Sequence, residues 1–266
     1  MQLHFKHRDF TGLLEVINPE NSPSEELELA LVRASSGQSI ERIYEGKESV
    51  LVILGGRCSV SIDGVGAWDN LGERKSVFDG QATAVYIPPG VRHRVSTDGF
   101  VEVAVFRAPA HRGGEEAYLV RPEEVQAVDR GQDNWRREVH DIIDETRPAK
   151  KLIVGETFND PGAWSSYPPH KHDVQDSPRE VRLQEIYHYR VQPETGFGLQ
   201  RLYSPERSFD ETFTVQDGDS FLVPFGYHPV VAAAGYQLYY LWALSGESRA
   251  LHPREDPVHS WISGGV

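Results

Sequence analysis

The sequence contains a single cysteine and no apolar run long enough to cross a membrane. One cysteine, Cys58, excludes an intrachain disulfide and a cysteine-rich zinc site, so any metal must be bound by histidine and carboxylate. Basic residues are also scarce, because 27 Lys and Arg stand against 40 Asp and Glu, a net charge of −13. Nucleic acids and anionic membranes bind basic surfaces, so neither is expected as a partner. An anionic small molecule would need a local Arg or Lys acting against the overall charge.

The N-terminal segment MQLHFKHRDF lacks the apolar stretch of a signal peptide, and a lone cysteine fits a reducing compartment. We therefore expect a cytoplasmic protein. The apolar neighbours of Cys58 predict a buried thiol rather than a nucleophile. The 266 residues, 39% of them hydrophobic and 25% charged, suffice for one large folded domain or two smaller ones.

Stripes of helical periodicity are scarce, whereas short runs of β-branched and aromatic residues recur between Gly, Pro, Asp and Asn. Such runs predict the strands of a sandwich or barrel. Helical turns are expected only near residues 23–27 and 122–128. The predicted strands include 49–54, 59–62, 82–87, 100–106, 152–156, 185–190, 197–203, 220–223 and 236–244.

One pattern occurs twice, about half a chain apart: an Asp-Gly pair, a strand, a Pro-x-Gly turn and a histidine. The copies are DG at 79–80 with PPG at 88–90 and His93, and DG at 217–218 with PFG at 224–226 and His228. A repeat of this length predicts an all-β fold of two tandem β-barrel domains, 1–132 and 133–266. The polar stretch 129–134 (DRGQDN) suits a surface linker between them.

The second half contains a His-x-His pair, His170 and His172, directly after a double proline. Residues two apart on a strand share a face, so both imidazoles would point one way and Lys171 would point outward. Glu185 opens a later strand, EIYHYR, and His228 follows the Pro-x-Gly turn. Three neutral imidazoles and one carboxylate suit a borderline divalent ion. We expect zinc, with manganese, iron or nickel as alternatives.

This order resembles the two-part metal motif of the cupins, small β-barrels whose ligands are His, His, Glu and His. Two departures stand out. An inserted loop, 173–179, lengthens the gap before Glu185, so Glu180 competes with it for the carboxylate position. Only Tyr227 separates Gly226 from His228, where two residues are common.

Longer phrases carry a closer resemblance: NLGERKSVFDGQATAVYIPPG (70–90), GETFNDPGAWSSYPPHKHD (155–173), EIYHYR, GFGLQRLY and VPFGYHPVVAAAGYQLYYLWALSG. They resemble the 5-deoxy-glucuronate isomerase family of myo-inositol catabolism, and this resemblance covers nearly the whole chain. That family is similar to the 5-keto-4-deoxyuronate isomerases. The resemblance implies a bicupin whose metal is held by His170, His172, Glu185 and His228. It also implies that 5-deoxy-glucuronate, an aldose acid, is converted to the ketose acid 2-deoxy-5-keto-gluconate.

Isomerisation of this kind needs a Lewis acid for the developing oxyanion and, on an enediol route, a base. Tyr187 is the candidate to shuttle a proton between oxygens, and Glu211 or a metal-bound hydroxide is the candidate base. A metal-mediated hydride shift would need no base.

Three residues are candidates for substrate binding. Tyr189 shares the face of Tyr187 and Glu185 by alternation, although both tyrosines are equally suited to filling a barrel interior. Arg201 and Tyr203 share a face of a neighbouring strand. Arg201 there is suited to a two-pronged grip on the substrate carboxylate, with a surface ion pair as the alternative.

The first half lacks a His-x-His pair, since the corresponding stretch, 37–42, reads GQSIER. We therefore expect a degenerate first barrel in which His93 is structural or lies at an interface. The tail, 250–266, is expected to pack as an irregular strap over a barrel. The alternative functions are an iron-dependent cupin dioxygenase and a cupin that binds a sugar acid without turnover. The expected partner is a small uronic-acid-type molecule, bound by a monomer or a homo-oligomer.

Overall fold

The computed structural model describes residues 1–264, and strands dominate it. They form five sheets in which every pairing is antiparallel. Three short 3-10 helices accompany them, at Pro122–Glu124, Asp133–Trp135 and Ser260–Ile262. Within the described residues, no helix has both the length and the apolar character that a membrane crossing requires.

The first half of the chain supplies two of the sheets. The larger has the order β11-β8-β5-β10-β3-β2: β2 (Gly12–Ile17), β3 (Glu28–Ser35), β5 (Lys47–Gly56), β8 (Thr83–Ile87), β10 (Phe100–Pro109) and β11 (Tyr118–Val120). The smaller has the order β4-β9-β6-β7: β4 (Gln38–Arg42), β6 (Cys58–Ile62), β7 (Gly66–Leu71) and β9 (His93–Thr97).

The second half supplies most of the other three sheets. The largest has the order β1-β20-β17-β22-β14-β13-β12: β1 (His4–Phe5), β12 (Gln126–Arg130), β13 (Arg137–Ile143), β14 (Ile153–Asn159), β17 (Leu183–Gln192), β20 (Ser220–Val223) and β22 (Gln237–Gly246). A second has the order β15-β21-β18-β19: β15 (Trp164–Ser165), β18 (Gly198–Tyr203), β19 (Asp210–Val215) and β21 (Val230–Ala232). The third pairs β16 (His170–Lys171) with β23 (Arg254–Glu255).

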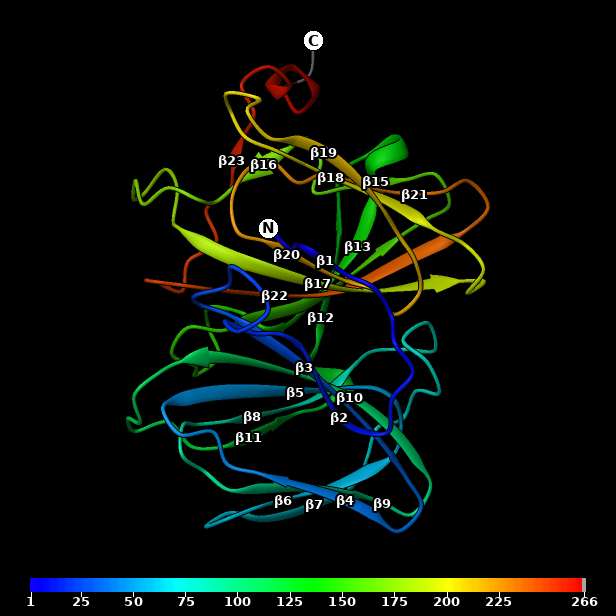
Figure 1. Ribbon diagram of the computed structural model, residues 1–266, viewed down its shortest axis with the longest axis vertical. Helices are drawn as coiled ribbons and strands as arrows, with labels where there is room; N and C mark the ends of the chain where they lie inside the picture. The colour runs from blue at the N-terminus through cyan, green and yellow to red at the C-terminus, as the bar shows by residue number, and fades with distance from the viewer. Residues whose placement is uncertain (265–266) are drawn as a thin grey trace.

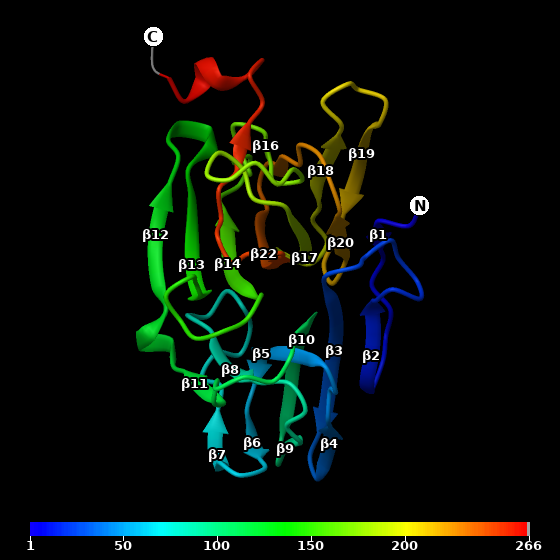
Figure 2. The ribbon, with the colours of Figure 1, turned by 90° about the vertical axis from the view of Figure 1, so that its left-hand side faces the viewer.

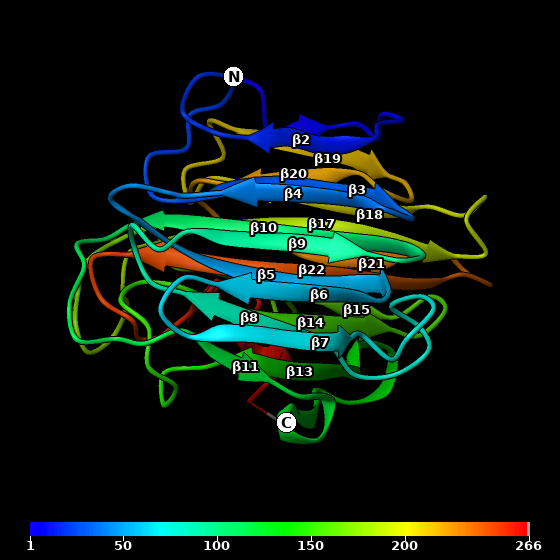
Figure 3. The same cartoon turned by 90° about the horizontal axis from the view of Figure 1, so that it is seen from below.

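The sheets are stacked along the long axis of the molecule, with the first half below the second (Figure 1). Seen from below, the strands of successive layers run in similar directions (Figure 3). Side chains of the six-stranded sheet alternate between two clusters: Leu51 and Ile53 face the interior of the first half, while Val50 and Val52 join the cluster that contains Ile186 and Leu241. The two large sheets therefore pack face to face and bury a shared apolar layer.

Strand pairing departs from the predicted boundary at 132 and 133 in two places. β12 precedes that boundary but pairs with β13, so the boundary falls inside a hairpin of the second half. β1 lies at the N-terminus but pairs with β20 of the second half. The chain thus changes from the first group of sheets to the second between Val120 and Gln126, whereas the division into two domains stays a prediction.

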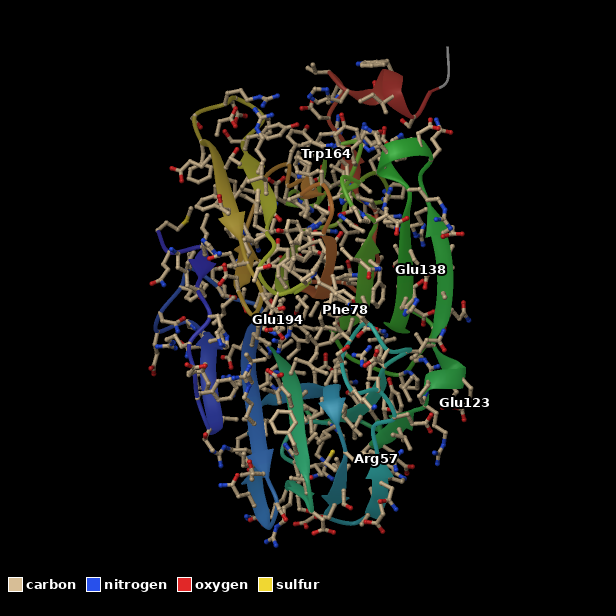
Figure 4. All side chains as sticks on the ribbon, turned by 90° about the vertical axis from the view of Figure 1, so that its right-hand side faces the viewer. Arg57, Phe78, Glu123, Glu138, Trp164 and Glu194 are labelled. Atoms are coloured by element: carbon tan, nitrogen blue, oxygen red, sulfur yellow. The ribbon has the colours of Figure 1, made fainter. Side chains whose placement is uncertain are left out.

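Buried polar contacts also join the halves. Glu48 of β5 accepts hydrogen bonds from the backbone N–H groups of Lys150, Lys151 and Leu152, at 2.6–2.8 Å. Arg74, from the first half, places Nη2 2.5 Å from Oε1 of Glu156 on β14, and both side chains are buried. Phe78, labelled at the junction in Figure 4, packs edge-on against Tyr239.

The nine strand predictions are confirmed, with small differences at their ends. The helical turn at 23–27 is wrong, because the N–H groups of Glu25 and Glu26 bond to the side chain of Gln184 on β17 instead. The second turn is confirmed only over Pro122–Glu124, and β12 follows it at once.

Candidate metal centre and active-site cavity

Three buried side chains of the second half bring potential metal ligands together. They are His172, Glu185 and His228, whose ligating atoms all lie within 4.8 Å of one another. Oε2 of Glu185 lies 3.2 Å from Nε2 of His172 and 3.3 Å from Nε2 of His228. Among residues 1–264, Nε2 of His228 is buried without a hydrogen-bond partner.

The other ring nitrogen of each histidine is fixed by the backbone. Nδ1 of His172 lies 2.9 Å from the carbonyl oxygen of Leu183, and Nδ1 of His228 lies 2.9 Å from that of Gly226. A carbonyl only accepts hydrogen bonds, so Nδ1 carries the proton and Nε2 presents a lone pair to the Glu185 carboxylate. Lone pairs facing one another at this distance call for a cation between them, and a backbone-anchored Nδ1 is typical of metal-binding histidines. The residues present therefore fit a divalent metal ion.

His170 stands beside this cluster. Its ring centroid lies 5.0 Å from that of His228 and 6.3 Å from that of His172. Burial, with the nearby His228 and His172, holds the pKa of His170 well below its ordinary value, so the imidazole is neutral and able to bind metal. The structure thus brings together all four residues that the sequence proposes as ligands, with His170 further from Glu185 than the other two histidines.

The electrostatics of the cluster favour a charged carboxylate. Burial alone would raise the pKa of Glu185, but with no cation between the groups a protonated His172 or His228 turns an Nε2–H toward the carboxylate, and these hydrogen bonds and charges lower its pKa to about 2. An ionised carboxylate buried beside imidazole nitrogens is the charge pattern that attracts a divalent cation.

The inserted loop resolves the competition between the two glutamates. Glu180 is fully buried, but its Oε1 accepts hydrogen bonds from Nζ of Lys171 and from the N–H groups of Asp173 and Val174. It is therefore committed to the loop, whereas Glu185 faces the histidines. The expectation that Lys171 points outward is wrong: it points away from the ligands but is buried between Glu180 and Asp173.

The turn that presents His228 depends on glycine. Gly226 has a φ of +81°, and a Cβ there would lie 2.6 Å from the carbonyl oxygen of Tyr203. The Gly226 N–H donates to Oδ2 of Asp173 at 2.7 Å. Asp173 therefore connects the segment carrying His170 and His172 to the turn carrying His228.

A cavity of about 710 Å³ opens over the cluster, reaching His170, His172 and Glu185. Its walls come from β13, β14, β17 and β22, and the C-terminal segment that crosses the top of the second half adds Pro253, Glu255 and Ser263 (Figure 2). β23 of this segment pairs with β16, the strand that carries His170. Gly265 and Val266 of the predicted strap lie outside the described residues.

The two tyrosines that follow Glu185 take different positions. Tyr187 lines the cavity, its hydroxyl lies 3.0 Å from Oγ of Ser166, and its ring lies 6.2 Å from that of His228. Tyr189 is fully buried and donates to Oε1 of Gln200 at 2.7 Å, so its hydroxyl is already engaged inside the protein.

The other three predicted site residues do not line this cavity. Arg201 makes a two-pronged ion pair with Asp210, the alternative weighed from the sequence. Tyr203 donates to Asp256, and Arg201 lies over its ring. Glu211 is exposed on β19. These positions give the predicted roles of the three residues no support.

The sequence did not single out Arg137, which also lines the cavity together with Val139 and Asp141. These residues alternate along β13 and share one face, but nothing in the local sequence says that this face is the inner one.

His93 of the first half is buried against the ring of Tyr44, and burial lowers its pKa.

The profile of the KduI/IolB family matches residues 3–262. The chain belongs to this family. It is 39% identical to a 5-deoxy-glucuronate isomerase of Geobacillus kaustophilus, with 93% of this chain and 95% of the relative covered. It is 35% identical to the 5-deoxy-glucuronate isomerase of Bacillus subtilis, with 94% and 92% covered.

Solved structures agree with the fold. The crystal structure of an IolB-like protein from Salmonella typhimurium LT2 superposes with a TM-score of 0.95 at 34% identity, covering 99% of this chain and all of that one. An oxalate decarboxylase from Lactobacillus farciminis has a TM-score of 0.67 at 13% identity, covering 100% of this chain and 91% of that one. The second likeness concerns the fold alone.

Proposed function

We propose that this protein is a metal-dependent aldose–ketose isomerase that converts 5-deoxy-glucuronate to 2-deoxy-5-keto-gluconate in myo-inositol degradation. The cluster of His172, Glu185 and His228, open to a cavity in a chain of this family, is the observation that carries the proposal. Relatives that align with more than 90% of the chain are named 5-deoxy-glucuronate isomerase, which supports the choice of substrate. We further propose zinc as the metal and the cytoplasm, where a lone cysteine stays reduced, as the location.

In this proposal His170, His172, Glu185 and His228 hold the metal. A bound divalent ion would supply Lewis acidity, stabilising negative charge on the carbonyl and neighbouring hydroxyl oxygens of the substrate. The reaction moves a hydrogen from C2 to C1 and a proton from the C2 hydroxyl to the C1 oxygen. Tyr187 carries the second transfer, since this residue lines the cavity and its hydroxyl is held by Ser166.

Two measurements on the same preparations test the proposal. Elemental analysis of the purified protein should find about one metal per chain, lost in His172→Ala and kept in His111→Ala, an exposed histidine outside the cluster. Proton NMR should show 5-deoxy-glucuronate converted by the wild type and by His111→Ala, but not by His172→Ala. A wild type that binds metal but leaves this substrate unchanged would contradict the isomerase assignment, and oxygen uptake by iron-loaded protein would favour the dioxygenase.

A further inference from the structure

Two cations line the cavity, and neither forms an ion pair within residues 1–264: Arg130 is exposed at the end of β12, whereas Arg137 is mostly buried. Arg137 opens β13 and lines the cavity, and its side chain is mostly buried. Among residues 1–264, no aspartate or glutamate forms an ion pair with it, whereas Arg136, next in the chain, is exposed and bound to Asp129. A guanidinium that is mostly withdrawn from water is costly unless an anion compensates it.

Backbone carbonyls hold Arg137 in place without neutralising it. Its Nη1 donates to the carbonyl oxygens of Trp135 at 3.3 Å and Tyr167 at 3.2 Å. Nε and Nη2 make no hydrogen bond within residues 1–264 and are not enclosed by protein atoms. These two nitrogens form the edge of a guanidinium that binds a carboxylate through two parallel hydrogen bonds.

Arg137 also lies at the metal end of the cavity. Tyr167, whose carbonyl it holds, is followed by the double proline that leads into His170. A molecule that reaches the metal ligands from the cavity therefore passes within the field of the Arg137 guanidinium.

The surrounding charges explain why a buried cation is useful here. The chain carries a net charge of −13, and the cavity wall includes Asp141, Asp144, Glu145 and Glu255. An anionic sugar would be repelled by these groups unless a cation offset them at its binding position.

We infer that Arg137 is the residue that selects an acid over a neutral sugar, by binding the substrate carboxylate through Nε and Nη2 while the aldehyde end faces His170, His172, Glu185 and His228. This inference rests on the proposed function, because that function supplies a substrate with a carboxylate at the far end from its aldehyde. It assigns to Arg137 the role that the sequence suggested for Arg201.

The test compares two probes that differ at one group, the carboxylate of D-glucuronate and the neutral carboxamide of D-glucuronamide, bound to metal-loaded protein and followed by calorimetry. The wild type and Arg136→Met should bind D-glucuronate about 10- to 100-fold more tightly than the amide, the range expected for a hydrogen-bonded charge. Arg137→Met should lose this preference, and Arg137→Lys should keep part of it. With 5-deoxy-glucuronate, Arg137→Met should raise KM more than it lowers kcat.

The outcomes separate this inference from the proposed function. Wild-type protein that binds both probes equally, or neither, would overturn the role of Arg137 even if 5-deoxy-glucuronate is isomerised. An Arg137→Met protein that keeps the preference would do the same. Metal content and thermal unfolding of each variant identify a folding defect, and Arg137→Lys then decides, because it retains the charge that the inference requires.

Discussion

Asp173 accepts a hydrogen bond from the backbone N–H of Gly226 at 2.7 Å, and so joins the segment of the His-x-His pair to the turn of His228. The contact connects two parts of the candidate metal site, although neither residue is one of the proposed ligands. Groups that position ligands in this way contribute to metal affinity.

Asp173→Ala should therefore weaken metal binding about 10-fold or more, because the His228 turn loses its anchor. Competition with a coloured chelator measures the change. Asp176→Ala is the matched control, since Asp176 lies in the same loop and its side chain pairs, among residues 1–264, only with Arg179. Equal affinity in the two variants would show that the contact does not position His228.

The two glutamates of this region should separate metal binding from stability. Glu185→Gln removes the charge that faces the histidines, so it should abolish tight metal binding. Glu180→Gln should keep the metal at saturation but lower the free energy of unfolding by about 1–3 kcal/mol, because buried Lys171 loses a charged partner. Urea unfolding of the metal-free proteins and elemental analysis give the two readouts. Loss of metal in Glu180→Gln, with stability unchanged, would reverse the assignment.

Features that depend on local sequence patterns, the strands and the motif residues, could be predicted from the sequence. Alternation predicts the strands, and the motif spacing predicts His172, Glu185 and His228, whose potential ligand atoms the structure brings within 4.8 Å of one another. The role of His170 as a fourth ligand stays a prediction. The competition between Glu180 and Glu185 could not be decided, since the loop fold that engages Glu180 with Lys171 is not visible in the spacing.

Features that depend on how distant strands pair could not be predicted from the sequence. Arg137 and Arg201 both lie on strands whose side chains alternate between two faces. Only the assembled sheets place Arg137 in the cavity and Arg201 against Asp210. The absent helical turn has the same origin, because Gln184, far along the chain, binds the N–H groups of Glu25 and Glu26.

The buried ion pair between Arg74 of the first half and Glu156 of the second should contribute strongly to the free energy of unfolding. Arg74→Met leaves the fully buried carboxylate of Glu156 without its cation, so the free energy of unfolding should fall by about 3–5 kcal/mol. Arg94→Met, which breaks an exposed pair with Glu41 inside the first half, should change it little. Denaturant unfolding measures both, and Arg74→Met/Glu156→Gln should recover part of the loss. Equal effects of Arg74→Met and Arg94→Met would remove the buried pair from the explanation.

Cys58 provides a separate probe of the first half, because it is the only cysteine and lies on β6. The structure confirms that it is buried, with 3% of its surface exposed, and burial raises its pKa to about 12. Since the thiolate is the reactive form, the native protein at pH 8 should react very slowly with a disulfide reagent, and one equivalent should react after unfolding in guanidinium chloride. Arg74→Met should speed the native reaction, because lower stability raises the population of open forms in which the thiol can react. Rapid labelling of the native wild type would show that the interior of the first half opens far more readily than its packing indicates.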